Sequence, residues 1–569
     1  MSERQIVIIS GKTCSGKTGL AELLEKEFGF FVVRTRDILS SHLELNASSA
    51  SRLDLIEQGQ KLNANTDSKW VVVGVLTGLD SIDANRPVVV DHVSDPNQVK
   101  EFRKQFGPSL VHVHLYASEE TLLSRYADTD GRRKDAPAYE SIDHLKEQWD
   151  VDALMKDADV RISTTRTDAQ DTLVRVAARL HLYTPPDVRC VDVVVGGQYG
   201  SEGKGNVVSY LAREYDVMVR VGGPNAGHTV ANAQGAYTYH HIPSGARDVK
   251  AKLLLGPGMT IWLPGLFKEI ADCALTPDRL FIDPQATIIE ESDRNAERQR
   301  LVGTIASTGS GSGSVTARRI LERGNPSVRL ARDVPELEPY VGTKGHYRGC
   351  TADRLEEAYR NGESILLEGT QGSGLSLFHG IYPFVTSRDT NVAGCLAEAG
   401  ISPSRVRKIL VVIRPMPIRV GDPDGDEGHT SGPLKHSTTF DAIAEKAKLD
   451  PNALRTAERT STTKRKRRVG WFEWDQFRKA CALNAPTDIV LTFADYIDAE
   501  NSKARRFEQL TEDTIKFVEE LERIAQAPVS LINTRFPREP DGTNDLRSVI
   551  DRRNWTARKS PDSSWTSKN

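Results

Sequence analysis

The sequence predicts an α/β protein built from two fused units, and three observations lead to this prediction. The chain has 569 residues, more than one hydrophobic core accommodates. In both halves, apolar runs of strand length alternate with longer polar stretches of helical length, which is typical of parallel sheets covered by helices. Each half also begins with a strand-like run and a glycine-rich loop that contains a Gly-Lys pair, GKTCSGKT at 11–18 and GGQYGSEGKGN at 196–206.

The boundaries of the two units follow from changes in composition along the chain. The first unit is predicted over 1–183, where IVIIS, RPVVVD and LVHVHLY mark strands of a parallel sheet. A pair of adjacent prolines indicates a linker at 184–190. The second unit follows over 191–550, and the polar, aperiodic stretch 551–569 is predicted to be a disordered tail.

Composition limits the partners and the compartment. A formal net charge of −3 with 27% charged residues creates no global field that recruits nucleic acid or a membrane surface. The six cysteines lack the paired spacing of a disulfide framework or a zinc site, which favours a reducing, cytoplasmic compartment. No apolar run approaches the about 18 to 20 residues of a membrane span, and MSERQIVIIS reads as a strand rather than a signal peptide.

The first glycine-rich loop matches a Walker A motif between the strand IVIIS and the helix TGLAELLEKEF. In such a loop, glycines such as Gly11 and Gly16 let backbone amides surround phosphates. Lys17 then reaches the terminal phosphates and Thr18 ligates magnesium. Asp91 ends the run RPVVV, where we expect a carboxylate near the metal, although a turn or helix cap is the alternative.

The first unit resembles the nucleoside monophosphate kinases in their broad sense, including adenylate kinase and dephospho-CoA kinase. The resemblance rests on the Walker A loop, on RTRD at 34–37, on KDADVRISTT and on the arginines of SRYADTDGRRKD, which are Arg125, Arg132 and Arg133. It implies phosphoryl transfer, in which arginines neutralise charge. An arginine-rich loop is also typical of a solvated surface, and the acceptor nucleotide stays open.

The second glycine-rich loop also predicts phosphate binding, because the strand VDVVV precedes it and a helix follows it. Its spacing differs from a Walker A motif. Five residues separate Gly197 from Gly203, and Gly205 follows Lys204 where Ser or Thr would be required.

Several later stretches continue this pattern, and in this order the series resembles adenylosuccinate synthetase over nearly all of 191–500. Alone, STGSGSGS would be a flexible linker and KRKRR a basic patch. The resemblance implies a larger α/β domain with a mixed central sheet. The stretches are RVGGPNAGHTV, HHIPSG, STGSGSGS, LLEGTQGSGLSLFHGIYPFVTS and ERTSTTKRKRRVGW.

The resemblance also implies a reaction and its residues. The six-position oxygen of a purine nucleoside monophosphate attacks the γ-phosphate of a nucleoside triphosphate, and the amine of L-aspartate then displaces that phosphate. His228 matches the acid toward the phosphoryl group, Lys204 a triphosphate ligand, and the Gly227 carbonyl a magnesium ligand. Arg318 matches an arginine from a neighbouring subunit, which implies a homodimer. The nucleotide-binding set is Gly200, Gly203, Gly205, Asn225, Thr308, Arg318, Gln371, Thr386 and Asp495.

The same resemblance assigns the aspartate substrate to the segment ERTSTTKRKRRVGW. Thr462, Thr463, Arg465 and Arg467 match the loop that binds its carboxylates. Two guanidiniums suit a dicarboxylate, because each donates bidentate, charge-assisted hydrogen bonds.

Ser201 departs from the family, which has an aspartate there that takes the proton from purine ring nitrogen 1 and ligates magnesium. A serine hydroxyl is no general base near neutral pH without a partner, so Glu202, a water or the substrate phosphate would have to replace it. One interpretation is a dead, nucleotide-sensing protein. The other is a guanine nucleotide as acceptor, since the smaller side chain leaves room for a 2-amino group, as in the viral branch of the family that uses deoxyguanylate. Retained His228 and Lys204 favour an enzyme.

A second departure concerns the triphosphate donor. The family recognises the guanine base of GTP with a Thr-Lys-x-Asp motif, and the corresponding stretch of this chain is TFAD at 492–495. Asp495 is kept, but Phe493 replaces the lysine, and NTRFP at 533–537 replaces a second guanine-binding segment. ATP therefore joins GTP as a candidate donor, and Phe493 is either a core residue or a stacking partner of the donor base.

Overall fold

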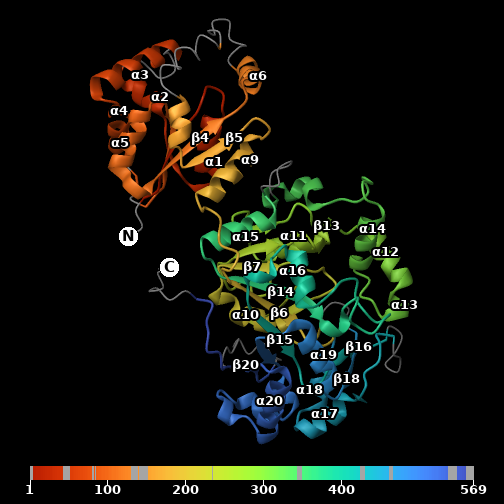
Figure 1. Cartoon of the computed structure of the whole chain (residues 1–569). Helices are drawn as coiled ribbons and strands as arrows, with labels where there is room; N and C mark the ends of the chain where they lie inside the picture. Colours follow the sequence, from red (N-terminus) through yellow and green to blue (C-terminus); the bar gives the residue numbers. More distant parts are fainter. Residues whose placement is uncertain are drawn as a thin grey trace. The chain divides into compact units, whose positions relative to one another are not determined.

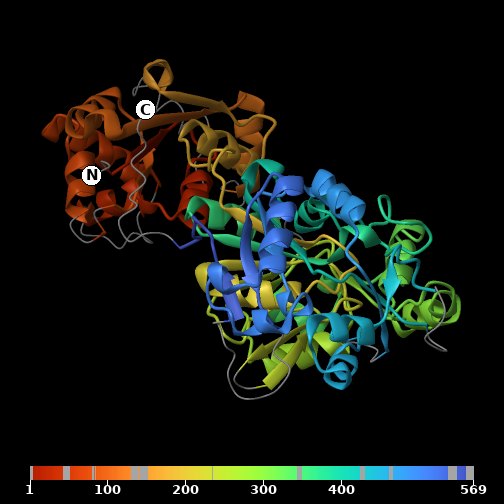
Figure 2. The same cartoon turned by 90° about the horizontal axis from the view of Figure 1, so that it is seen from below.

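The computed structural model divides into two compact units, Met1–Thr184 and Pro185–Asn569, each described by itself (Figures 1 and 2). The described residues are 4–42, 52–79, 82–83, 85–129, 139, 151–232, 235–341, 349–422, 430–460, 465–535 and 548–558.

The first unit is a five-stranded parallel sheet between two layers of helices (Figure 1). Its strand order is β2 (Phe31–Val33), β3 (Val88–Val93), β1 (Ile6–Ser10), β4 (Leu110–Tyr116) and β5 (Val160–Ser163). Its described helices are α1 (Lys17–Phe28), α2 (Thr35–His42), α3 (Arg52–Thr66), α4 (Trp70–Leu79), α5 (Pro96–Phe106), α6 (Glu119–Thr129), α8 (Val151–Asp157) and α9 (Ala169–Arg179).

Alternation along β1 explains the two helical layers, because successive side chains of a strand point to opposite faces. Ile6 and Ile8 pack in one cluster with residues of α4 and α5, whereas Val7 and Ile9 pack in another with residues of α1 and α9. The predicted P-loop type of parallel sheet is confirmed.

The second unit is built on a nine-stranded sheet that is parallel except for its last strand, so the predicted mixed sheet is confirmed. The order is β12 (Leu280–Ile282), β10 (Lys252–Leu255), β7 (Val217–Arg220), β14 (Ile365–Gly372), β6 (Val191–Gly196), β15 (Val406–Ile413), β19 (Asp488–Leu491), β20 (Val529–Asn533) and β21 (Val549–Asp551).

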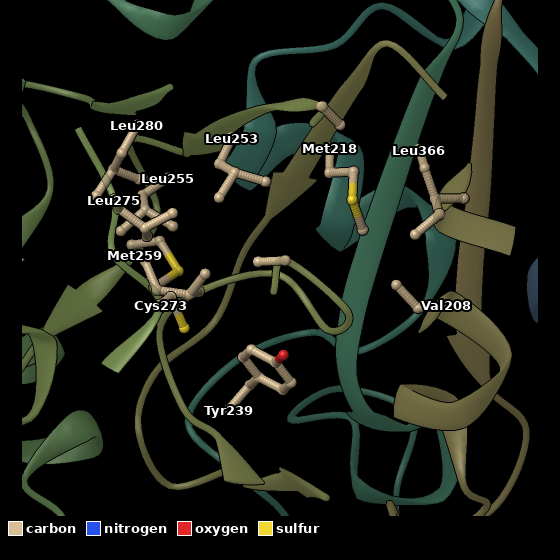
Figure 3. Close-up of a cluster of buried hydrophobic side chains, with 14 of the residues drawn as sticks. Val208, Met218, Tyr239, Leu253, Leu255, Met259, Cys273, Leu275, Leu280 and Leu366 are labelled. Atoms are coloured by element: carbon tan, nitrogen blue, oxygen red, sulfur yellow. The ribbon is translucent and has the colours of Figure 1, made fainter. Parts of the chain in front are cut away.

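Each face of this sheet carries its own hydrophobic cluster. On one face α10 (Lys204–Leu211) and α11 (Leu263–Asp272) cover the strands. Figure 3 shows Met218 of β7, Leu253 of β10 and Leu366 of β14 there, with Val208 of α10 in the same cluster. The other face is covered by α15 (Thr351–Arg360), α16 (Val392–Ala399), α19 (Trp474–Asn484) and α20 (Glu512–Ala525).

Smaller elements accompany the large sheet. They include the hairpin β8 (His228–Asn232) and β9 (Gly235–Tyr239), the pair β11 (Thr260–Ile261) and β13 (Thr287–Ile288), and a three-stranded sheet of β16 (Ile418–Val420), β18 (Arg467–Gly470) and β17 (Ser437–Thr438). The other α-helices described in this unit are α12 (Glu291–Arg300), α13 (Val302–Ile305), α14 (Ser312–Leu321), α17 (Phe440–Ala447) and α18 (Pro451–Ala457).

The structure corrects the start of the predicted tail. The last strand of the sheet ends at Asp551, and Ala557 beyond it is only 4% exposed. Arg553 pairs with Glu214 at 2.6 Å, which fixes this stretch to the rest of the unit. A polar stretch without periodicity is therefore ordered here through long-range ion pairs, which composition does not reveal.

No helix within the described residues is long and apolar enough to cross a membrane.

Candidate active site

The glycine-rich loop and several buried charged residues of the second unit gather at the carboxyl ends of its parallel strands. The glycine-rich loop follows β6, Arg220 ends β7, and Glu368 lies in β14. Arg414 follows directly after β15. Because the carboxyl ends of parallel strands share one edge of a sheet, ligands of such folds bind in the crevice outside that edge.

The glycine-rich loop is organised around the buried carboxylate of Glu202. One of its oxygens accepts the N–H groups of Gln198 at 2.9 Å and Gly200 at 2.8 Å. The other accepts Lys204 Nζ at 2.8 Å, and both side chains of this pair are at most 1% exposed. Gly200 and Gly203 have φ values of 96° and 82°, which favour glycine. Both oxygens of Glu202 are thus engaged inside the loop, an environment different from that of a general base.

Ser201 lies half-buried in this loop, and its backbone carbonyl accepts a hydrogen bond from Arg414 at 3.1 Å. Gly205, in the first turn of α10, explains why no serine or threonine follows the lysine. A Cβ atom at this position would lie 2.9 Å from the Cβ atom of His228. The glycine therefore lets the start of the helix approach the histidine.

His228 is held by a buried pair of charges. Its Nδ1 lies 2.6 Å from Glu368 Oε1, and the other oxygen of Glu368 lies 3.0 Å from Arg220 Nη1. Ser244 donates its backbone N–H to the same carboxylate at 2.8 Å. The short contact to a carboxylate assigns the proton of the neutral ring to Nδ1, which leaves a lone pair on Nε2.

The electrostatics of this group keep the ring neutral. Burial, together with the charge of Arg220, lowers the pKa of His228 to about 4, against the opposing effect of Glu368. Burial alone would raise the pKa of Glu368, but Arg220 and His228 outweigh it and lower that pKa to about 2. The carboxylate is therefore ionised and the imidazole uncharged at neutral pH.

Several predicted ligand residues carry buried polar atoms that lack a hydrogen-bond partner within the part of the chain that the structure describes. Three atoms among them are His228 Nε2, Asn225 Oδ1 and Gln371 Oε1. Buried polar atoms are usually satisfied, so these three are candidates to bind a ligand. Gln371 also has a φ of 62°, uncommon for this residue type, and donates to Thr386 Oγ1 at 2.8 Å.

Two other residues predicted to bind the nucleotide, Thr308 and Arg318, make side-chain contacts within the second unit. Thr308 Oγ1 donates to Ser310 Oγ at 3.1 Å. Arg318 makes a bidentate ion pair with Asp293, at 2.9 and 2.7 Å, so its guanidinium is engaged within its own subunit rather than reaching away from it. The N-terminus of α14 is occupied as well, because Glu297 accepts the N–H of Gly311 at 2.8 Å.

The predicted aspartate loop is described in part, since Thr462 and Thr463 lie outside the described residues. Arg465 Nη1 donates to the carbonyl of Ala306 at 3.3 Å, which brings this arginine beside the STGSGSGS segment. Arg467 Nη1 donates to Glu458 Oε2 at 2.6 Å.

The two residues predicted at the donor base are buried, Phe493 at 7% and Asp495 at 3% exposure. The ring of Phe493 belongs to a hydrophobic cluster, and the Arg414 guanidinium lies 4.1 Å from its centroid. A Cβ atom on Gly203 would lie 3.2 Å from this ring. The ring of Phe493 thus packs against the glycine-rich loop at Gly203, in agreement with the interpretation of Phe493 as a core residue.

In the first unit, Lys17 holds the Walker A loop together through hydrogen bonds to backbone carbonyls of the loop. Lys17 Nζ donates to the carbonyls of Gly11 at 2.8 Å and Lys12 at 2.7 Å. Gly11 has a φ of 137°, and a Cβ atom there would lie 2.0 Å from a carbonyl oxygen of β4, while Gly16 caps α1 with a φ of 98°. Thr18 is exposed in the first turn of α1.

The structure shows the contacts of Asp91 and Arg125, for which the sequence left alternative roles open. Asp91 accepts the N–H of Thr35 at 2.9 Å, so it caps the start of α2. Burial raises the pKa of Asp91 despite the nearby Lys17. Arg125 donates to the carbonyl of Thr164 at 2.6 Å, whereas Arg132 and Arg133 lie outside the described residues.

The comparison with known families decides the identity of the second unit. The adenylosuccinate synthetase family model matches residues 193–334 and 327–502, more than half of the chain. The chain belongs to the adenylosuccinate synthetase family. A model described as an AAA domain matches residues 7–147 of the first unit.

Individual members of the family align over nearly their whole length. The adenylosuccinate synthetase of Pyrococcus horikoshii is 35% identical over 368 residues, which are 63% of this chain and 98% of that protein. The enzyme of Methanocaldococcus jannaschii is 34% identical and is covered to 97%.

Two solved structures are similar to the second unit. The succinoaminodeoxyadenylate synthetase of cyanophage S-2L, bound to dGMP and to dATP as an energy donor, has a TM-score of 0.51 and 26% identity over 64% of this chain and 95% of its own. The adenylosuccinate synthetase of Plasmodium falciparum, with a TM-score of 0.53 and 20% identity over 64% of this chain and all of its own, shares the fold.

In this family member, four site residues were not singled out from the sequence: Arg220, Glu368, Arg414 and Glu458. Each is at most 3% exposed and carries a full charge. Charged residues are rarely buried unless they are paired with an opposite charge. The sequence does not show which charged residues are buried in such pairs. The one available signal was position, because Arg220, Glu368 and Arg414 each stand at or near the end of an apolar run.

Proposed function

We propose that the unit Pro185–Asn569 ligates L-aspartate to position 6 of a purine nucleoside monophosphate, using a nucleoside triphosphate. The observation that carries this proposal is His228, whose Nε2 is buried without a partner within the described chain at the mouth of a loop built to hold phosphates. Membership in the family and the neighbouring Lys204 support the same conclusion.

The reaction consists of two displacements. The six-position oxygen of the purine bonds to the γ-phosphorus, the bond from that phosphorus to the β–γ bridging oxygen breaks, and the nucleoside diphosphate leaves; ring nitrogen 1 loses its proton. The amine of aspartate then bonds to carbon 6, the carbon–oxygen bond breaks, and phosphate leaves, while the amine gives up a proton.

His228 and Lys204 serve the first displacement. An arriving phosphoryl group is negatively charged and raises the pKa of the imidazole, so that Nε2 takes up a proton and donates it to the transferring phosphate. Glu368 keeps the ring in position through Nδ1. Lys204 balances the charge of the phosphates, and Glu202, with both oxygens engaged, positions Lys204 and the loop amides.

The acceptor that we propose is a guanine nucleotide, dGMP. Ser201 leaves more room than aspartate beside the purine edge, which accommodates a 2-amino group. The similarity to a structure solved with dGMP supports this choice. The competing acceptor is IMP, favoured by the adenylosuccinate synthetases that are 34 to 35% identical to this chain.

For the donor we propose ATP or dATP. The lysine of the guanine-reading motif is replaced by Phe493, whose ring is buried against Arg414. Magnesium would be held by the Gly227 carbonyl and the Ser201 hydroxyl beside the triphosphate, and by Thr18 in the first unit, where it would neutralise phosphate charge. The described residues hold no cluster of three or more His, Cys, Asp or Glu side chains suited to a metal, which agrees with an ion bound mainly through substrate phosphates.

Two further proposals concern the activity of the first unit and the assembly of the second. The first unit acts as a nucleotide kinase, supported by its Walker A geometry around Lys17. The second unit forms a homodimer through the surface near α14, because Ile320 and Leu321 of this helix are 58% and 83% exposed. Large exposed apolar side chains that gather on one surface are typical of interfaces.

A substrate matrix tests the proposed ligation. The full chain is mixed with L-aspartate, ATP or GTP, and each of IMP, dIMP, GMP and dGMP, and succinylated products are measured by mass spectrometry. We expect the guanine product, with dGMP preferred. Product from IMP alone would identify an adenylosuccinate synthetase with an unexplained serine. Nucleotide binding without any product would identify a sensor, and a His228→Asn variant provides the inactive control.

A further inference from the structure

Arg414 is one of the largest fully buried side chains of the protein, and its backbone is fixed to the glycine-rich loop. The N–H of Arg414 donates to Gln198 Oε1 at 3.0 Å, and its carbonyl accepts Gln198 Nε2 at 3.0 Å. An arginine buried to this extent requires partners for its charge. These partners lie on both sides of the site.

The guanidinium of Arg414 connects two loops that are far apart in the sequence. Nη1 donates to the carbonyl of Ser201 at 3.1 Å, and Nη2 donates to Glu458 Oε1 at 2.9 Å. The rings of Phe493 and Tyr496 lie 4.1 and 5.0 Å from it. A planar fork packed against two adjoining aromatic rings has little freedom to move, which distinguishes arginine from lysine at such a place.

Glu458 continues this connection to the aspartate loop. Its Oε1 also accepts the hydroxyl of Tyr496, and its Oε2 accepts Arg467 Nη1 at 2.6 Å. Burial would raise the pKa of Glu458, but Arg414 and Arg467 outweigh it and lower that pKa to about 2, so the carboxylate stays ionised.

The charge balance of this chain of contacts favours an acidic ligand. One carboxylate lies between two guanidiniums, which leaves one positive charge in excess. The side chain of Arg414 is 1% exposed and that of Arg467 is 17% exposed. The excess charge is therefore accessible only at Arg467, where an acidic substrate can reach it.

We propose that Arg414 is a positioning residue that couples the aspartate site to the phosphate-binding loop, through the contacts Ser201–Arg414–Glu458–Arg467. This inference rests on the proposed ligation of aspartate. The carbonyl of Ser201 and the guanidinium of Arg467 are joined by two buried side chains. The distance between the phosphorylated purine and the attacking amine is therefore set by Arg414, although this residue touches neither substrate.

Steady-state kinetics of the full chain test the coupling. Arg414→Lys keeps the charge but replaces the planar guanidinium, whose Nη1 and Nη2 donate to two loops, by a single ammonium group. One ammonium cannot hold both loops in the same geometry. We expect the KM for aspartate to rise at least about tenfold, with the KM values of purine nucleotide and triphosphate within about threefold of wild type. A uniform fall in kcat with unchanged KM for aspartate would overturn the proposal.

A double-mutant cycle gives the sharper readout. If Arg414 acts through Arg467, the double variant Arg414→Lys/Arg467→Leu has the same KM for aspartate as Arg467→Leu alone. Penalties that multiply would show that the two arginines act independently and would contradict the coupling. Arg455→Lys is the matched control, since this nearby arginine pairs with Asp441 on the surface.

A second variant covers the case in which Arg414→Lys unfolds. Phe493→Leu removes the ring beneath the guanidinium and keeps all charges, so we expect a smaller rise in the KM for aspartate, about threefold. Circular dichroism and thermal unfolding confirm folding. Wild-type protein that forms no succinylated product contradicts the proposed function itself, whereas active wild type with an unaltered aspartate KM in both variants contradicts the coupling alone.

Discussion

At the scale of single residues, the proposed choice of acceptor depends on Ser201. Its backbone carbonyl accepts a hydrogen bond from Arg414, a contact that a substitution of the side chain leaves in place. A change of a few atoms in a substrate pocket alters relative rates by about 10- to 200-fold. Small differences at this position therefore matter for the choice between a guanine nucleotide and IMP.

Restoring the carboxylate tests this role. We expect Ser201→Asp to lower the rate on dGMP by at least about tenfold, because the larger side chain crowds the 2-amino group. The same change supplies a base and a metal ligand, so the rate on IMP is expected to hold or rise. The measurement is the ratio of the rates on dGMP and IMP in the two proteins, with Ser201→Ala as the control that removes only the hydroxyl. A natural protein that strongly prefers IMP would refute the guanine interpretation.

Glu368 provides a second test at this scale. We expect Glu368→Gln to lower kcat by about 10- to 100-fold with little change in the KM values, since the amide no longer favours the charged imidazole. Glu368 opposes the effects of burial and Arg220 on His228, so without it the pKa of His228 falls further below about 4. The pH–rate profile of the variant checks this direction. Equal kcat in both proteins would remove Glu368 from the mechanism.

At the scale of elements, β4 carries two buried histidines whose protonation opposes folding. His112 Nε2 and His114 Nδ1 lie 2.6 and 2.8 Å from Ser10 Oγ in β1. Burial lowers the pKa of each to about 4. In the unfolded chain the value is about 6.5, so the unfolded state binds more protons between pH 4 and 6.5. Stability from this cluster is present above pH 6.5 and is lost as the pH falls through this window.

The expected loss for one histidine is at most about 3 kcal/mol. Hydrogen exchange of peptides from β1 and β4 in the full chain, corrected for intrinsic rates, should show protection falling from pH 6.5 toward 4.5. His112→Asn should flatten this dependence. An equally steep dependence in the variant would show that other groups cause it.

Residues 552–558, which follow β21, belong to the folded unit. Arg553 pairs with Glu214 and Asp551, at 2.6 and 2.8 Å, and its side chain is 6% exposed. Breaking such a pair leaves buried charge uncompensated. We therefore expect Arg553→Ala to lower the free energy of unfolding by about 2 to 4 kcal/mol, measured by urea denaturation. A chain ending at Arg558 is the control and should keep wild-type stability. An unchanged midpoint in Arg553→Ala would mean that the ion pairs contribute nothing.

At the scale of the whole molecule, the chain joins two units that each contain a glycine-rich loop with a Gly-Lys pair. If the two sites are separate, Lys17→Ala should abolish phosphoryl transfer by the first unit and leave the ligation of aspartate intact. Nucleotide phosphorylation and succinylated product are measured in the same preparation, and Lys204→Ala is the reciprocal variant. Loss of both activities in Lys17→Ala would contradict two separable sites.

The sequence by itself determined the fold class and the kind of chemistry. Alternating apolar runs depend on local periodicity, and both glycine-rich loops are contiguous, so GKTCSGKT and GGQYGSEGKGN could be interpreted without knowing what surrounds them. Four of their glycines, Gly11, Gly16, Gly200 and Gly203, adopt the positive φ values that favour this residue type. His228 and Arg467 could likewise be singled out, because the motifs around them are continuous.

Only the tertiary structure decided which charges stand beside these residues. Glu368 contacts His228 from 140 positions away, and Arg414 contacts Ser201 from 213 positions away. These pairs exist because the carboxyl ends of β6, β7, β14 and β15 meet at one edge of the sheet. Strand order is a property of long-range pairing, and no local periodicity encodes it. The long-range ion pair of Arg553 with Glu214 likewise explains why residues 552–558 are folded. Glu202 holds its loop through contacts within four residues, but the sequence alone did not show that both of its oxygens are engaged there.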